Sequence, residues 1–191
     1  MTKAIYLAII LFCLRCLISW NSIISSFSLY NIWGYIGEAI GITTIIMALY
    51  EKWLWRLNKF EDLPLLKKKY NGKLKSSYDK IERDAQLVIN QTLLSIHVIL
   101  ISNESKSKSI SASIDDILGE KQLTYCYLNT PKVEFRNRSE IHYGTAMLSI
   151  ANSDILIGQY FTDRCTRGDM EFIAEEVSNK TITIKDELLS K

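Results

Sequence analysis

The chain has 191 residues, and its 23 basic and 21 acidic side chains give a formal net charge of +2. A charge this close to zero does not favour bulk binding to nucleic acid, so we expect no direct contact with DNA or RNA. Cys13 and Cys16 lie inside an apolar segment, which argues against a redox or zinc motif. Cys126 and Cys165 are predicted to be reduced thiols of a cytosolic domain.

Two apolar segments open the chain, Ala4–Phe27 and Trp33–Leu54. Each supplies the roughly 20 helical residues needed to cross the hydrocarbon core of a bilayer. A signal peptide is the alternative for the first segment. The second apolar run follows almost at once, however, which favours an uncleaved two-helix hairpin. The connection at Asn21–Asn31 is uncharged and basic residues flank the other ends, so both termini are predicted to be cytoplasmic.

Arg15 and Glu38 are charges inside these apolar segments. At 1.5 Å per helical residue from the flanking lysines, they are expected ~18 Å and ~21 Å into the membrane. Isolated charges there are costly, so we expect a pair, either within one hairpin or between neighbouring hairpins. Such a pair serves either as a structural link or as part of a pore. Gly34, Gly37 and Gly41 recur at a spacing that permits close helix contact, which favours self-association.

The composition changes after the second apolar segment. We predict a two-helix transmembrane region at 1–58, a basic juxtamembrane connector at 59–69 and a cytoplasmic β-barrel domain at 70–191. Pro64 is expected to stop the helix within the connector. The basic residues of the connector suit the anionic cytoplasmic surface of a membrane.

Short runs rich in Val, Ile, Thr and Tyr follow the connector. Their spacing predicts eight sequential strands and hence an eight-stranded up-and-down antiparallel β-barrel. The expected strands are Gly72–Tyr78, Gln86–Gln91, Leu93–Ser102, Lys108–Ile114, Gln122–Asn129, Glu140–Ile150, Ile155–Asp163 and Asp169–Glu175. Hairpin turns are predicted at Asn103–Lys106 and Thr166–Asp169. Thr181–Ile184 either adds a last strand or frays.

Alternation along the strands predicts where a ligand could bind. An eight-stranded barrel either fills its interior with side chains or holds one small ligand. In Ile155–Arg164, one face runs from apolar Leu156 to cationic Arg164, and tyrosines, hydroxyls and an amide recur on the faces of other strands. Such groups suit a ligand with flat rings and phosphate. The candidate ligand-binding residues are Tyr78, Tyr127, Asn129, Arg136, Tyr143, Tyr160, Thr162 and Arg164. Alternatively, the tyrosines only pack the barrel, and Arg164 lies on its rim.

Motifs for catalysis are absent from the sequence. It has no Gly-rich phosphate loop, no zinc-spaced Cys/His set and no nucleophile elbow. The two histidines, His97 and His142, have no obvious catalytic partner in the sequence. We therefore predict that the protein is not an enzyme and that it uses neither a cofactor nor a metal ion.

The segment Leu156–Gly168, LIGQYFTDRCTRG, carries a family resemblance. Together with two membrane helices and a basic juncture, it resembles the transmembrane β-barrel effectors of bacterial CBASS anti-phage defence, which are associated with CD-NTase enzymes. The motif begins with a glycine and continues with a tyrosine, a second aromatic residue, a threonine, an acidic or amide residue and an arginine. A turn glycine follows. Its residues here are Gly158, Tyr160, Phe161, Thr162, Asp163, Arg164 and Gly168.

The resemblance implies a function as well as a fold. Members are expected to be minimal barrels that sense a cyclic dinucleotide made by a partner CD-NTase after phage infection. Binding is then expected to drive homo-oligomerisation, disruption of the bacterial inner membrane and abortive cell death. The alternatives are a membrane-anchored barrel that binds or senses an apolar small ligand, and a membrane enzyme, for which no set of catalytic residues appears.

Overall fold

The computed structural model describes residues 2–20, 24 and 28–176. The chain divides into two compact units, Met1–Glu61 and Asp62–Lys191. The predicted strand at Thr181–Ile184 and part of the predicted connection at Asn21–Asn31 lie outside the described residues.

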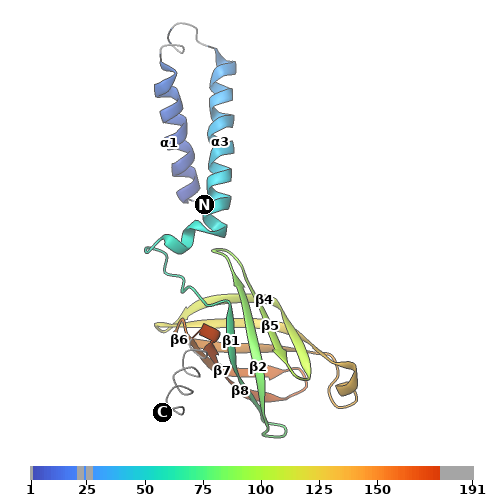
Figure 1. Cartoon of the computed structure of the whole chain (residues 1–191). Helices are drawn as coiled ribbons and strands as arrows, with labels where there is room; N and C mark the ends of the chain where they lie inside the picture. The colour runs from blue at the N-terminus through green and yellow to red at the C-terminus, as the bar shows by residue number, and fades with distance from the viewer. Residues whose placement is uncertain (1, 21–23, 25–27, 177–191) are drawn as a thin grey trace, which may run out of the picture. The chain divides into compact units, whose positions relative to one another are not determined.

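The first unit consists of α1 (Thr2–Ile18), α3 (Leu29–Lys52) and the short 3-10 helix η1 (Leu54–Leu57). α1 and α3 lie side by side (Figure 1). α3 buries only Ala39 and Thr43, so its other apolar side chains are partly or largely exposed. Within the described residues, α3 is the one helix long and apolar enough to cross a membrane, and the apolar part of α1, Ala4–Ile18, is shorter.

Arg15 and Glu38 meet between α1 and α3. Arg15 Nε donates a hydrogen bond to Glu38 Oε2 at 2.8 Å, and another guanidinium nitrogen donates to Ser19 Oγ at 2.6 Å. The guanidinium also lies 4.7 Å from the centre of the Tyr35 ring. Of the two arrangements expected from the sequence, the structure therefore has the pair within one hairpin.

The second unit is a closed barrel in which each strand pairs antiparallel with the next and β8 returns to β1 (Figure 1). Its strands among the described residues are β1 (Lys69–Ser76), β2 (Glu82–Gln91), β3 (Ile96–Ser102), β4 (Ser105–Ile117), β5 (Glu120–Pro131), β6 (His142–Asn152), β7 (Ile155–Thr162) and β8 (Arg167–Ala174). Two N-terminal helices followed by an eight-stranded up-and-down barrel confirm the fold predicted from the sequence.

The barrel core follows from the two-residue period of its strands. Leu87, Leu123, Leu148, Leu156 and Phe172 come from five different strands, and each is completely buried. Their neighbours in sequence face outward, where the wall of the barrel meets solvent. Closure pairs β1 with β8, so the sheet exposes no unpaired edge strand.

One predicted turn is wrong. Thr166–Asp169 is not a hairpin turn, because β8 already begins at Arg167 and the turn comes earlier, with Cys165 at a φ of 59°. Gly168 pairs with Tyr160 of β7. A Cβ at Gly168 would lie 2.3 Å from the Lys75 carbonyl oxygen and 2.6 Å from the Tyr160 ring. The glycine is therefore needed for close approach within the wall, not for a turn.

The up-and-down order gives the barrel two distinct ends. At the open end, the strands are joined by the connections 77–81, 103–104, 132–141 and 163–166. The connection 132–141 includes the 3-10 helix η2 (Val133–Phe135). At the opposite end, which we call the connector end, residues 62–68 enter β1. Any site at the open end therefore lies a full strand length away from the entering chain.

The entering chain is held at the connector end by neutral groups, in addition to the ion pairs that Asp62 and Lys67 make. Gln91 accepts a hydrogen bond from Leu66 N at 2.9 Å and donates one to the Pro64 carbonyl oxygen at 2.9 Å. The Tyr70 hydroxyl accepts from Lys67 N at 2.8 Å and donates to the Ser153 carbonyl oxygen at 2.7 Å. Burial raises the pKa of Tyr70 to about 12, so the phenol remains neutral and can donate.

Candidate ligand site at the open end of the barrel

A cavity of about 190 Å³ lies at the open end of the barrel. It is lined by strand residues and by side chains from the connections at that end. Of the residues predicted from the sequence, it brings together Tyr78, Tyr127, Asn129, Tyr160, Thr162 and Arg164. Tyr78 is 85% exposed and lies at the rim, whereas Tyr127 and Asn129 are buried in the wall.

Two predicted residues, Arg136 and Tyr143, do not line the cavity. Tyr143 is 58% exposed, while Ala146 and Leu148 of the same strand are fully buried. The even-numbered positions of β6 therefore face the interior, and Tyr143 and Thr145 face outward. Arg136 immediately follows η2, in a connection whose side chains follow no strand period.

Two tyrosines lie against glycines on the neighbouring strands. Tyr127 of β5 pairs with Gly144 of β6, and a Cβ at Gly144 would lie 2.5 Å from the end of the Tyr127 ring. Tyr160 of β7 pairs in the same way with Gly168 of β8. Each glycine leaves space for a ring to lie against the inner wall. Both rings therefore line the cavity, Tyr160 half-buried and Tyr127 almost completely buried.

Polar side chains in the wall are fixed by their neighbours. Ser107 Oγ donates to Asn129 Oδ1 at 2.9 Å, which leaves the amide nitrogen of Asn129 as the group that can donate to a ligand. Thr162 Oγ1 lies 2.6 Å from Thr166 Oγ1. Burial raises the pKa of Tyr127 above its ordinary value of 10, so its hydroxyl remains a neutral donor.

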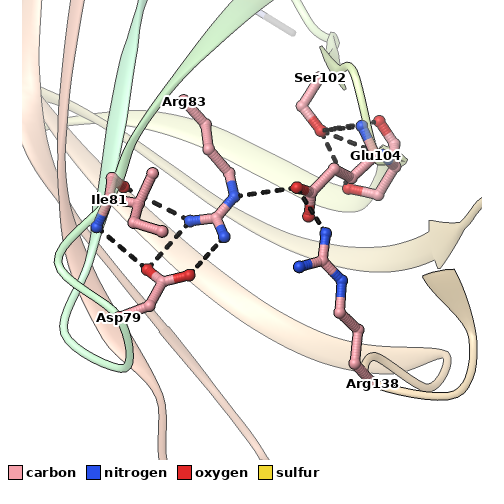
Figure 2. Close-up of polar contacts among 7 residues, drawn as sticks. Asp79, Ile81, Arg83, Ser102, Glu104 and Arg138 are labelled. Carbon is pink, nitrogen blue, oxygen red and sulfur yellow. Dashed lines mark hydrogen bonds and ion pairs between the residues drawn. The ribbon is translucent and has the colours of Figure 1, made fainter.

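A cluster of ion pairs crosses the open end, and none of its four residues was predicted from the sequence (Figure 2). Arg83 of β2 forms a two-point pair with Asp79, one arm of which measures 3.1 Å. Arg83 Nε also lies 3.3 Å from Glu104 Oε1. Arg138 approaches the same Glu104 oxygen at 2.7 Å. We refer to Asp79, Arg83, Glu104 and Arg138 as the mouth cluster.

The electrostatics of the mouth cluster are strongly coupled. Hydrogen bonds from Arg83 lower the pKa of Asp79 from 3.8 to about 2. The same bonds, with Glu104 adding to them, raise the pKa of Arg83. Asp79 is therefore ionised at neutral pH, and Asp79 and Glu104 already pair with the arginines that an incoming anion would need.

Arg164 extends these contacts to the last connection of the open end. Its guanidinium donates to Ser139 Oγ at 3.1 Å and to the Arg138 carbonyl oxygen at 3.4 Å. The connections 77–81, 103–104, 132–141 and 163–166 are thus joined by polar contacts around one cavity. A signal for Arg83 exists in the sequence, because it shares the inward face of β2 with Ala85, Leu87 and Ile89. The predicted strand began at Gln86, three residues too late to include it.

The cavity combines the groups needed to recognise phosphate and flat rings. Among the described residues that line it, three are arginines and two are carboxylates, and the aromatic surface comes from tyrosines. Guanidinium groups bind phosphate oxygens in well-defined geometry. Within the part of the chain that the structure describes, no group of three or more His, Cys, Asp and Glu side chains could hold a metal ion.

Comparisons with known proteins agree with this chemistry. Residues 62–173 match the family model described as Cap15, cyclic dinucleotide receptor domain. A relative from Staphylococcus schleiferi, named CD-NTase-associated protein 15, is 31% identical over 142 residues, covering 71% of this chain and 76% of the relative. The chain therefore belongs to the Cap15 family of CBASS effectors, whose matched domain is a cyclic dinucleotide receptor, and the resemblance stated from the sequence is confirmed.

Proposed function

We propose that this protein binds a cyclic dinucleotide in the cavity at the open end of its barrel and then self-associates and disrupts the bacterial inner membrane. One observation supports the binding step: tyrosines and arginines line the same cavity, in a chain that belongs to this family. The ligand would come from a CD-NTase partner, and membrane damage would kill the infected cell before phage release.

Each part of the ligand has a partner in the wall. The bases pack on Tyr127 and Tyr160, where stacking contributes about 1–3 kcal/mol per base. The phosphates bind Arg164 together with Arg83 and Arg138 of the mouth cluster. Asn129 donates through its amide nitrogen, and Thr162 supplies a hydroxyl. Because Arg136 and Tyr143 lie outside the cavity, we assign them no ligand contact in this proposal.

The first unit is the output element in this proposal. Both apolar segments cross the inner membrane, residues 59–69 form the juxtamembrane connector, and both termini are cytoplasmic. The apolar side chains exposed along α1 and α3 support membrane insertion, because water does not favour such a surface. The Arg15–Glu38 pair satisfies its charges inside one hairpin, which suits a resting state in lipid.

Self-association would use the face of α3 that carries Gly34, Gly37 and Gly41. A Cβ at any of these glycines would meet no other atom within 4 Å, so α1 does not occupy this face. Small residues on an open helix face allow a second hairpin to approach closely. A ligand drives such assembly only by binding the assembled form more tightly than the single chain.

The proposal is tested on the full chain in lipid nanodiscs or in vesicles. Calorimetric titration with a panel of cyclic dinucleotides is expected to give saturable binding of at least one, and the same ligand is expected to release dye from vesicles. An apolar ligand that binds while every cyclic dinucleotide fails would favour the alternative, a carrier or sensor of apolar molecules. Binding without dye release or any increase in oligomer size would retain the receptor and remove the membrane step.

A further inference from the structure

The Glu104 side chain occupies the space between two arginines at the open end. One carboxylate oxygen lies 2.7 Å from Arg138 and 3.3 Å from Arg83 Nε (Figure 2). An oxygen that bridges two guanidinium groups is also the arrangement in which a phosphate oxygen binds arginine. In the structure, a carboxylate of the protein itself makes this contact.

The size of the cavity indicates that something at the mouth must move when a nucleotide enters. The cavity measures about 190 Å³, whereas pockets for small molecules usually measure roughly 300–1,000 Å³. A ligand with two bases and two phosphodiester groups does not fit wholly inside a cavity of this size, so its full entry requires side chains at the mouth to move. The mouth cluster lies in the path of the ligand. Its side chains are held by ion pairs, and the phosphates of the ligand can form ion pairs with the same arginines.

The charges that line the cavity also indicate that a side chain at the mouth moves when the ligand binds. Three arginines and two carboxylates among the described lining residues give the cavity a charge of about +1 in its present state. Two phosphodiester groups bring two negative charges. If both carboxylates kept their positions, anions would crowd the same guanidinium groups, and like charges at such distances repel strongly.

Glu104 is held much less firmly than Asp79. Asp79 makes a two-point pair with Arg83 and also accepts a hydrogen bond from Ile81 N at 3.1 Å. Glu104 reaches both arginines through one oxygen. Its backbone is separately anchored, because Lys132 N donates to its carbonyl oxygen at 2.9 Å. The Glu104 side chain can therefore swing away while the connection 103–104 stays in place.

We propose that Glu104 is an internal placeholder for a ligand phosphate: it bridges Arg83 and Arg138 in the empty receptor, and a phosphate displaces it on binding. The inference rests on the proposed function. Each ligand must compete with Glu104 for the two arginines, so the residue lowers the affinity of every ligand and excludes those that lack an anionic group. Glu104 is thus a specificity-determining residue that opposes binding.

The direction in which one substitution changes ligand affinity separates this role from an ordinary structural role. Glu104→Gln keeps the shape but removes the charge, so the arginines are released for the ligand. We expect the dissociation constant for the cyclic dinucleotide to fall by roughly three- to tenfold, given the modest strength of partly exposed ion pairs. Glu104→Asp is expected to give an intermediate value, because the shorter side chain cannot bridge both arginines.

The matched control is Glu82→Gln, which removes the same charge from the outward face of β2, where Glu82 pairs with Lys73. Calorimetry on the full chain compares wild type, Glu104→Gln and Glu82→Gln. Tighter binding by Glu104→Gln alone supports the proposal. Equal tightening in both variants would assign the effect to overall charge, and unchanged or weaker binding by Glu104→Gln would make Glu104 a structural or ligand-contacting residue. Either result overturns the proposal.

A second probe keeps this inference separate from the proposed function. Inorganic phosphate is titrated into the same three proteins, and the rise in unfolding temperature is measured. A larger rise for Glu104→Gln than for wild type and Glu82→Gln is expected, since the anion then meets two free guanidinium groups. If wild type binds no cyclic dinucleotide, the proposed function fails, and the phosphate result alone decides whether Glu104 holds an anion site.

Discussion

At the connector end of the barrel, buried neutral groups hold the entering chain in addition to ion pairs, whereas the mouth cluster at the open end consists of ion pairs between partly exposed side chains. Gln91 and Tyr70 bind the backbone of the entering chain directly. At the open end, Arg83 and Arg138 instead reach the side chain of Glu104, and Arg83 makes one longer backbone contact, to the Ile81 carbonyl oxygen at 3.4 Å. Neutral buried contacts are costly to break, and exposed ion pairs are readily exchanged. The hydrogen bonds to the backbone at the connector end therefore contribute stability, whereas the side-chain ion pairs at the open end can exchange partners.

The largest effect on stability is expected in the buried interior of the barrel. Phe172→Ala removes a fully buried ring from the interior of the barrel and should cost about 3–5 kcal/mol in free energy of unfolding. Chemical unfolding followed by tyrosine fluorescence and circular dichroism measures it, because all four tryptophans lie in the first unit and none in the barrel. Ile173→Ala, one residue along on the outward face, is the control and should cost far less. Equal losses would show that the two faces of β8 do not differ as described.

The second-largest effect on stability is expected for the hydrogen bonds that Gln91 makes at the connector end. Gln91→Leu leaves Leu66 N and the Pro64 carbonyl oxygen without their hydrogen bonds, and each buried unpaired group costs about 1–3 kcal/mol. The unfolding temperature should fall, and hydrogen exchange at the Leu66 amide should accelerate. Ligand affinity should not change, because this end lies away from the cavity. A large loss of affinity in Gln91→Leu would contradict the division between the two ends.

Substitutions at the open end should change ligand affinity more than the stability of the fold. Arg164→Ala removes a guanidinium from the cavity and should weaken cyclic dinucleotide binding by about 10- to 100-fold, since a hydrogen bond to a charged group is worth about 1.5–3 kcal/mol. Arg136→Ala is the control, because the sequence predicted both arginines as ligand contacts but only Arg164 lines the cavity. Equal weakening in both variants would return Arg136 to the site, and unchanged affinity in Arg164→Ala would remove Arg164.

The smallest effect is a pH dependence of the mouth cluster. Arg83 lowers the pKa of Asp79 to about 2, so the pair stabilises the folded state fully above the ordinary pKa of 3.8. That stabilisation is lost as the pH falls from about 4 through 2. Asp79→Asn should therefore flatten the dependence of the unfolding temperature on pH in this range only. A difference in slope near neutral pH would mean that another group is responsible.

Alternation in the sequence was enough to predict eight strands and the composition of their faces. On β7, Tyr160 and Thr162 share the inward face with Leu156, as the pattern indicated. On β6, the same reasoning favoured Tyr143, but the strand buries Ala146 and Leu148. A two-residue period states which side chains share a face. It does not state which face is inside, because only closure of the barrel decides that.

Apart from Arg83, which the strand pattern could have placed, the mouth cluster lay beyond sequence reasoning for a different physical reason. Glu104 and Arg138 belong to connections, where no period constrains the side chains, and their partners come from residues that are distant along the chain. Gly168 was read as a turn residue, yet it makes room for the Tyr160 ring across a strand pair. The sequence by itself determined the helices, the strand order and the family, because these depend on local pattern and on recurring motifs. Only the tertiary structure decided which charges meet at the open end, because ion pairs form between neighbours in space.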